Sequence, residues 1–148
     1  MWKQIASSHV WDGSVWKAVY SALKPQGMTK TGNQLIPQGM TQVAGWTADA
    51  NSTVTSNALV IAGSKSGAVL NAKVVFASNY NTRIYQMEIR RGATVLASKS
   101  GNGTVSGVMS LTLDPTTVTV AAGDQLTFWA NSAFTANRVD EGTFLSIV

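Results

Sequence analysis

Apolar side chains recur at every second position along two stretches of this chain, and that period constrains its fold most. The stretches are residues 70–76 and residues 83–90. Side chains along a strand point alternately to opposite faces of a sheet, so the pattern predicts two half-buried strands. In the second stretch we expect Tyr85, Met87 and Ile89 to face the core, with the polar residues between them facing outward.

Further short runs rich in β-branched and aromatic residues are separated by turn residues, which is typical of additional strands. The sequence finishes on Phe144–Val148 without a polar tail, and we expect this run to be a core strand because untied termini fray. No long window combines good helix formers at helical spacing. The sequence therefore predicts an all-β sandwich or barrel, of which the jelly roll is a common form. The other expected strands are residues 42–46, 57–61, 94–97, 108–113, 118–120 and 126–130, with a loop over residues 98–107.

The first part of the chain differs from the rest. Residues 1–34 hold three of the five tryptophans and have poor periodicity, with turn residues around Gly27 and Gly32. Within them, residues 15–20 fit a short strand after the Asp12-Gly13 turn. We therefore predict a hairpin and connector over residues 1–34, followed by one β-sandwich domain over residues 35–148.

The composition excludes several classes of protein. Cysteine is absent, so neither a disulfide framework nor a thiolate metal site is expected. The net charge is +4, but the basic residues are dispersed, whereas nucleic-acid binding needs a clustered basic face. No apolar run approaches the roughly 20 residues of a membrane-spanning helix, and the first residues lack the apolar stretch of a signal peptide. Charged residues make up 12% of the chain, against about 25% in ordinary soluble domains, which favours a protein that assembles or faces the outside of a cell.

The titratable residues do not predict an enzyme. His9 is the only histidine, and the sequence around Asp12 and the serines lacks a nucleophile elbow. Asp114 precedes a proline and Asp124 follows a glycine, so both are interpreted as turn residues. We predict no catalytic residue, no cofactor and no dedicated metal site.

Asp140 and Glu141 are the only adjacent acidic residues. In a strand they would face opposite ways, which does not favour a pair of carboxyl groups in one cleft. A weak Ca²⁺ site at these two residues, completed by loop carbonyl groups, stays open.

The order of these segments resembles the C1q/TNF-like jelly roll in the form found in phage tail and receptor-binding proteins. Val69 and Arg91 depart from it, at positions where family members often carry an aromatic residue and an asparagine. An upstream Gly-Ser-Val-Trp-Lys segment, residues 13–17, is similar to a strand that precedes terminal domains of phage tail proteins. The segments that carry the main resemblance are residues 34–46, 67–76, 89–97, 118–129 and 142–148.

The resemblance implies a homotrimer in which aromatic side chains are hidden around an axis. Phe128 and Trp129 are adjacent in a predicted strand, so one of them must point away from the core of its own subunit. An outward tryptophan is reasonable at a subunit interface. The expected interface residues are Tyr85, Trp129 and Phe144.

Two segments have the composition of a sugar site, in which an aromatic ring is surrounded by amides and hydroxyls. The alternative for each is an ordinary polar loop with a packed aromatic residue. The candidate glycan-binding residues are Asn79, Tyr80, Asn81 and Arg83 in the first segment and Asn131, Phe134, Asn137 and Arg138 in the second.

Together these features predict a non-enzymatic structural and receptor-binding module of a phage tail, located in the virion or outside the cell. Its expected partners are two further copies of itself, other tail proteins through the N-terminal segment, and a host-surface glycan; nucleic acid and membrane insertion are not expected. The alternative is a secreted C1q-like recognition domain without a virion. An enzyme comes third, since a fold alone does not exclude a grafted catalytic site.

Overall fold

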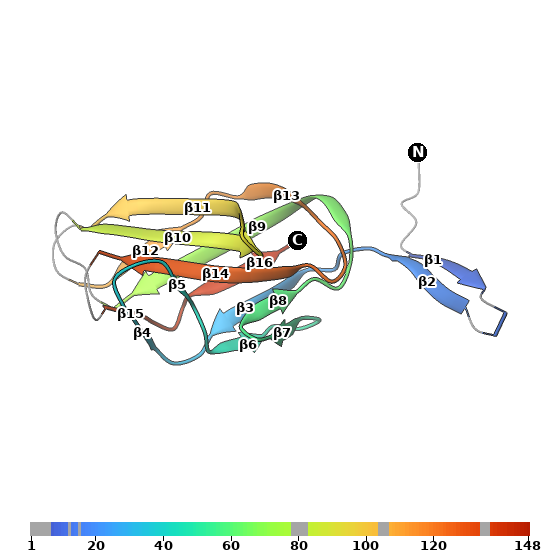
Figure 1. The fold of residues 1–148 in the computed structure, drawn as a ribbon, viewed down its shortest axis with the longest axis horizontal. Helices are drawn as coiled ribbons and strands as arrows, with labels where there is room; N and C mark the ends of the chain where they lie inside the picture. The colour runs from blue at the N-terminus through green and yellow to red at the C-terminus, as the bar shows by residue number, and fades with distance from the viewer. Residues whose placement is uncertain (1–6, 12, 15, 78–82, 104–106, 134–136) are drawn as a thin grey trace.

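The computed structural model describes residues 7–11, 13–14, 16–77, 83–103, 107–133 and 137–148 (Figure 1). These residues form strands, turns and bends, and none of them is helical. Accordingly, this described part of the chain holds no helix long and apolar enough to span a membrane. Two antiparallel sheets pack face to face as a sandwich, which confirms the predicted all-β class.

The first sheet has the strand order β11-β10-β14-β8-β7, and β5 also pairs with β14. At its centre, β10 and β14 pair over seven residues each, from Tyr85 opposite Ser132 to Arg91 opposite Leu126. The strands are β5 (Thr41–Gln42), β7 (Thr53–Thr55), β8 (Ala58–Val60), β10 (Ile84–Arg91), β11 (Thr94–Asn102) and β14 (Gln125–Ser132).

The second sheet has the order β4-β15-β9-β16-β3-β6, and β12 and β13 pair with different parts of β9. The predicted terminal strand is confirmed, because β16 lies between β9 and β3 in the interior of this sheet. The strands are β3 (Gln26–Lys30), β4 (Gln34–Ile36), β6 (Trp46–Ala48), β9 (Lys65–Phe76), β12 (Met109–Thr112), β13 (Thr116–Val120), β15 (Asn137–Val139) and β16 (Phe144–Ile147).

A hairpin of β1 (Ser7–Trp11) and β2 (Trp16–Ser21) forms a separate two-stranded sheet that extends beyond one end of the sandwich (Figure 1). The chain enters the sandwich at an isolated parallel bridge between Ala22 and Ser64. Gly63 lies beside this bridge, where a Cβ atom would stand 2.7 Å from backbone atoms of Ala22 and Leu23.

The predicted boundary after residue 34 differs from this arrangement. Residues 26–30 form β3, which pairs with both β16 and β6 and therefore belongs to the sandwich. The prediction interpreted Gly27 as a strand breaker, whereas it is buried opposite Ser146. Glycine fits there because the two chains approach closely: a Cβ atom at Gly27 would lie 3.0 Å from the carbonyl oxygen of Leu145.

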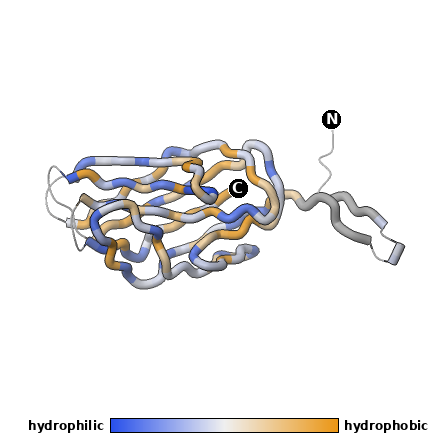
Figure 2. Tube along the Cα trace, in the orientation of Figure 1, coloured by the Kyte–Doolittle hydropathy of each residue, from blue (hydrophilic) through white to orange (hydrophobic). Residues whose placement is uncertain are grey.

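The core lies between the sheets, and apolar and polar stretches alternate along the strands that enclose it (Figure 2). Tyr85, Met87 and Ile89 are buried, as the period-two pattern predicts. Tyr85 packs on Phe76 of the opposite sheet, with 5.0 Å between the ring centroids. Burial of about a dozen large side chains of this kind provides the main stabilisation of the fold.

The predicted loop over residues 98–107 is wrong for its first five residues. Strand β11 runs to Asn102 and pairs with β10 along its whole length, so that Ser98 lies opposite Glu88 and Ser100 lies opposite Gln86. Serine and glycine are poor strand formers, but pairing with a long neighbouring strand overrides that local preference.

Candidate functional site

The two outer faces of the sandwich carry different side chains. On the first sheet, residues that alternate with the buried ones point outward and form a surface that we call the β10/β14 face. Its members lie on four adjacent strands, so the surface is continuous. They are Gln42, Gln86, Glu88, Arg90, Ser98, Ser100, Thr127, Trp129 and Asn131.

Trp129 stands at the centre of this face, opposite both Glu88 of β10 and Gln42 of β5. Its indole Nε1 donates a hydrogen bond to Thr127 Oγ1 at 2.9 Å. Arg90 covers the ring, with its guanidinium carbon 4.4 Å from the ring centroid. Phe128, the preceding residue, is fully buried, so Trp129 is the outward member of the pair.

Ion pairs and amide contacts fix the rest of the β10/β14 face. Glu88 Oε2 accepts a hydrogen bond from Arg90 Nε at 2.7 Å and lies 2.6 Å from Arg90 Nη2. Asn131 Nδ2 donates to Gln86 Oε1 at 2.8 Å, and Asn131 Oδ1 accepts from the backbone of Gly39 at 3.1 Å. These contacts hold polar groups in place before any ligand arrives.

A hollow of about 350 Å³ lies between β10 and β11 on this sheet. Among the described residues, Ser98, Ser100 and the amide nitrogen of Gln86 have no side-chain hydrogen-bond partner. The sequence prediction missed these serines because it placed them in a loop. In the structure, exposed and less exposed positions alternate along β11 from Ala97 onward, as in a strand, but this alternation follows from the pairing with β10 and cannot be read from the residue types. The hollow is lined by Gln86, Met87, Glu88, Ser98, Lys99 and Ser100.

We call the central part of the outer surface of the second sheet the β9/β16 face, and Lys73 is its charged residue. Charged groups also lie beside it: Asp49 Oδ1 accepts a hydrogen bond from Thr29 Oγ1 at 3.0 Å, and Arg138 is exposed on β15. Phe144 lies on it between Thr29 of β3 and Lys73 of β9. Phe144 is half-buried even though it points away from the core, while the neighbouring Leu145 is fully buried. The residues that define this face are Thr29, Val69, Asn71, Lys73, Val75, Ser110, Thr112, Phe144 and Ser146.

The structure separates the three expected interface residues. Tyr85 is fully buried in the core of its own subunit, so its ring presents no surface to a partner. Trp129 and Phe144 belong to different sheets, and their inward neighbours belong to one shared core. They therefore point away from opposite sides of the sandwich, and one flat contact cannot include both.

The candidate glycan residues are also separated. Arg83 and Arg138 are exposed, and Asn131 belongs to the β10/β14 face. Asn137 is buried, where its Nδ2 donates to Ser132 Oγ at 3.1 Å and its Oδ1 accepts from the backbone of Arg138, so it supports the fold. The other predicted residues, Asn79, Tyr80, Asn81 and Phe134, lie outside the described residues.

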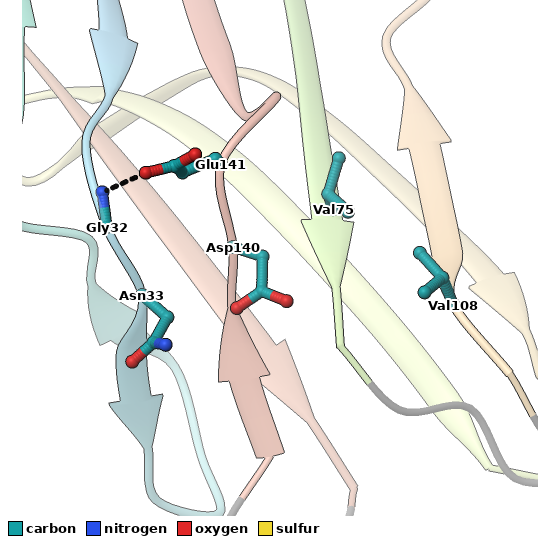
Figure 3. A pocket seen from close by; sticks show the side chains of 6 residues that line it. All are labelled: Gly32, Asn33, Val75, Val108, Asp140 and Glu141. Carbon is teal, nitrogen blue, oxygen red and sulfur yellow. Dashed lines mark hydrogen bonds between the residues drawn. The ribbon is translucent and has the colours of Figure 1, made fainter.

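Asp140 and Glu141 line one hollow, although they are not in a strand as the expectation that they face opposite ways assumed. Strand β15 ends at Val139, so both residues fall in the following turn, where strand alternation no longer applies. Both line an open hollow of about 360 Å³ with Gly32, Asn33, Val75 and Val108 (Figure 3). Glu141 Oε1 accepts a hydrogen bond from the backbone of Gly32 at 3.0 Å.

A buried cation lies near this acidic turn. Lys30 is 4% exposed, and its Nζ donates to the carbonyl oxygen of Thr31 at 3.0 Å. Burial lowers the pKa of Lys30 below its ordinary value of 10.5, while the negative charges of Asp140 and Glu141 oppose that change. Within the described ranges, no three His, Cys, Asp or Glu side chains come together as a set of metal ligands.

The remaining titratable residues considered in the sequence analysis lie in strands and turns, with the following contacts. His9 lies in β1, and Asp12 lies outside the described residues. Asp114 pairs with Lys99 at 2.7 Å. Asp124 Oδ2 accepts from the backbone of Ala121 at 3.0 Å, which confirms its interpretation as a turn residue.

Neither a protein-family model nor a curated protein matches this sequence. Among solved structures, the chain is similar to Eiger TNF from S. frugiperda, with a TM-score of 0.65 and 9% identity over 86% of this chain and 92% of that one. Murine APRIL aligns with a TM-score of 0.48 and 14% identity, over 84% of this chain and 98% of that one. A carbohydrate-binding module of lichenase 5A from Cellvibrio mixtus, solved with cellotriose, aligns with a TM-score of 0.38 and 14% identity, over 98% of this chain and 88% of that one. The first likeness confirms the TNF-like jelly-roll fold, and at 9% identity it establishes the fold alone.

Proposed function

We propose that this chain is a non-enzymatic recognition module of a phage tail, which assembles as a homotrimer and contacts glycans of the host surface. The observation that carries the proposal is the difference between the outer faces of the sandwich. At the centre of one face, Phe144 lies among short polar and aliphatic residues with Lys73 as the single charge, whereas the other face is centred on Trp129 and the Glu88–Arg90 ion pair. A module that must both assemble and bind a ligand needs two such surfaces.

The β9/β16 face suits contact between copies of the chain. Cores of protein interfaces are depleted of charged residues and enriched in aromatic ones. Lys73 is the single charged member of this face and lies opposite Phe144, and the next outward residues of β9 on either side of Lys73 are Asn71 and Val75. Val108 is 69% exposed and lines one hollow with Val75, and this hollow also holds Asp140 and Glu141, so the apolar surface ends at two carboxylates there.

Trp129 lies outside the proposed trimer contact. Head-to-tail contacts close a ring only if the rotation between subunits closes, and patches on opposite faces would instead stack copies into an open filament. We therefore assign Phe144 to the contact between subunits and leave the β10/β14 face on the outside of the trimer. Three outward faces on one particle would bind a surface of repeated glycans with greater avidity than one.

The N-terminal hairpin suits attachment to the rest of the tail. Strands β1 and β2 pair with each other and extend beyond the end of the sandwich, and no third strand of the described residues pairs with them (Figure 1). Sheet edges of this kind pair readily with further strands. We therefore propose a domain boundary near Ala22, with residues 22–148 as the recognition domain; the bridge of Ala22 with Ser64 supports it.

Light scattering on a size-exclusion column tests the assembly. We expect a particle of three times the 15.6 kDa chain mass for the wild type, and a single chain for Phe144→Asp, because the aromatic ring is lost and the new carboxylate, together with Lys73 opposite it, would have to be desolvated at the contact. Gln125→Asp, an exposed position on the opposite sheet, is the matched control and should stay trimeric. A wild type that runs as one chain at micromolar concentration would remove the trimer from the proposal.

Binding to a glycan array tests the recognition function. We expect the wild type to retain a defined subset of oligosaccharides and to lose avidity in the Phe144→Asp variant. The alternative of a secreted C1q-like recognition domain predicts the same two results. The genes beside the coding sequence separate the two, since neighbouring tail genes support a virion protein and their absence supports the alternative.

A further inference from the structure

We propose that the glycan lies on the β10/β14 face, with its hydroxyl groups in the hollow between β10 and β11, and that it is a neutral, hydroxyl-rich oligosaccharide. This inference rests on the proposed recognition function and assigns it a site. The site differs from the two loop segments suggested by the sequence, of which only Asn131 takes part.

The hollow offers hydrogen-bonding groups that no other described residue uses. The hydroxyls of Ser98 and Ser100 can both donate and accept, and the amide nitrogen of Gln86 can donate. Glu88 contributes a carboxylate. Its Oε2 is bound to Arg90, and the described contacts do not involve its Oε1, which can therefore accept a further hydrogen bond. Adjacent sugar hydroxyls need this mixture of donors and acceptors.

The Arg90–Trp129 pair lies next to these groups, with the guanidinium carbon of Arg90 4.4 Å from the centroid of the ring. Glu88 lies in register with Ser98 on one side and with Trp129 on the other, so the hollow and the ring share this residue. A pyranose ring has an apolar face and a polar edge, and sites for such ligands combine a few placed polar groups with an aromatic surface. We infer that the apolar face of the sugar packs against the Arg90–Trp129 stack while its edge enters the hollow.

The charges on this face favour a neutral ligand. Glu88 and Arg90 neutralise each other at 2.6 Å, and they are the only charged members of the β10/β14 face. Lys99, at the rim of the hollow, is paired with Asp114. An anionic sugar would find no uncompensated cation in this described surface, and it would lie beside the carboxylate of Glu88.

The size and order of the site fit weak, repeated binding. A hollow of about 350 Å³ is at the small end of the range for small-molecule sites, about 300–1,000 Å³, so it takes one or two sugar units rather than a long chain. The side chains around it are held by the Glu88–Arg90 and Asn131–Gln86 contacts, so little side-chain entropy is lost on binding.

The test begins with an array of neutral oligosaccharides beside their sialylated and sulfated counterparts. The tightest neutral glycan is then titrated by calorimetry, per binding site, into the wild type, Ser98→Val and Glu88→Gln. Each variant removes one hydrogen-bonding partner, and we expect a loss of about tenfold in affinity for each. Ser66→Val, another exposed strand serine but on β9 of the other sheet, is the matched control and should bind like the wild type.

Hydrogen exchange of the wild-type protein with and without the same glycan keeps the test independent of any variant. Slower exchange in β10 and β11 on addition of the glycan supports the site. Unchanged affinity of both variants, or protection confined to residues 137–141, overturns the site while the recognition function stands. Preference for anionic glycans overturns the ligand class. Failure of the wild type to bind any glycan overturns the proposed function and the site together.

Discussion

The guanidinium carbon of Arg90 lies 4.4 Å from the centroid of the Trp129 ring, across the pairing of β10 with β14. The same guanidinium group is held by Glu88, with 24% of the Arg90 side chain and 22% of the Glu88 side chain exposed. The carboxylate of Glu88 therefore holds the guanidinium group on one side, and the ring of Trp129 holds it on the other. Side chains from two neighbouring strands are thereby kept in one arrangement on the outer surface of the sheet.

We expect this contact to be measurable as an energetic coupling. In a double-mutant cycle of Arg90→Ala and Trp129→Ala, followed by urea unfolding, the coupling free energy should be about 0.5–1 kcal/mol, the usual value for a partly exposed cation–π pair. The cycle of Arg90→Ala with Phe144→Ala joins residues on opposite faces and should be additive. A coupling of zero in the first cycle would mean that the stack does not persist in solution.

Tyr85 should behave as a core residue rather than as an interface residue. Tyr85→Ala removes a fully buried ring that packs on Phe76, and we expect the free energy of unfolding to fall by about 3–5 kcal/mol. The loss should be the same at every protein concentration. Phe144→Ala should instead weaken the trimer, so that the midpoint of unfolding depends less strongly on concentration than in the wild type. A reversal of these two behaviours would contradict the assignment.

Gly63 should tolerate no side chain, because the chain entering the sandwich passes directly over it. In Gly63→Ala the new methyl group would meet the carbonyl carbon and oxygen of Ala22 at 2.7 Å, and we expect a loss of about 1–3 kcal/mol of stability in thermal or urea unfolding. Gly101→Ala is the matched control, since its methyl group would meet the end of the Leu111 side chain, which can rotate away. Equal losses in the two variants would show that the entry of the chain at Ala22 is not fixed.

Asp124 should contribute to stability at neutral pH and lose that contribution in acid. Burial acts to raise the pKa of Asp124, but hydrogen bonds from Ala121 and Arg91 and the charge of Arg91 outweigh it, so the pKa lies below its ordinary value of 3.8. A carboxyl group with a lowered pKa stabilises the fold above its unfolded-state pKa, and the contribution disappears as the pH falls through the lower, folded-state value.

The variant that checks this is Asp124→Asn. Since 41% of the Arg91 side chain is exposed, we expect the variant to be less stable than the wild type by at most about 1 kcal/mol in urea at pH 7. The difference should shrink as the pH falls through the folded-state pKa of Asp124, because both proteins then carry a neutral side chain. A difference that stays constant as the pH falls would assign the effect to shape rather than to charge.

Long alternating strands could be predicted from the sequence because one face of each is buried in the core. The inward side chains of β10, the outward Trp129 and the terminal strand β16 all follow from the period of two. Strand β3 could not be predicted, because Gly27 and Lys30 break the pattern locally and only the pairing with β16 and β6 makes the segment a strand. Strand β11 was cut short for the same reason, since its pairing with β10 outweighs the weak strand preference of Ser98 and Ser100.

The candidate sites could be predicted by composition but not by position. Asn131 was identified from its loop-like neighbours and lies on the outer face, whereas Asn137, with the same chemistry, is buried against Ser132. Nothing in the local sequence distinguishes these two asparagines. The stack of Arg90 on Trp129 joins residues 39 positions apart, so it depends on the register of β10 with β14.

The division of the sandwich into an assembly face and a ligand face is tested most directly by labelling single cysteines. The chain has no cysteine, so Ser110→Cys on β12 and Ser100→Cys on β11 each introduce one thiol at an exposed strand position, on opposite faces. With a maleimide reagent under conditions of assembly, we expect the thiol at position 110 to react much more slowly than the thiol at position 100. Equal rates, or slower reaction at position 100, would contradict the account.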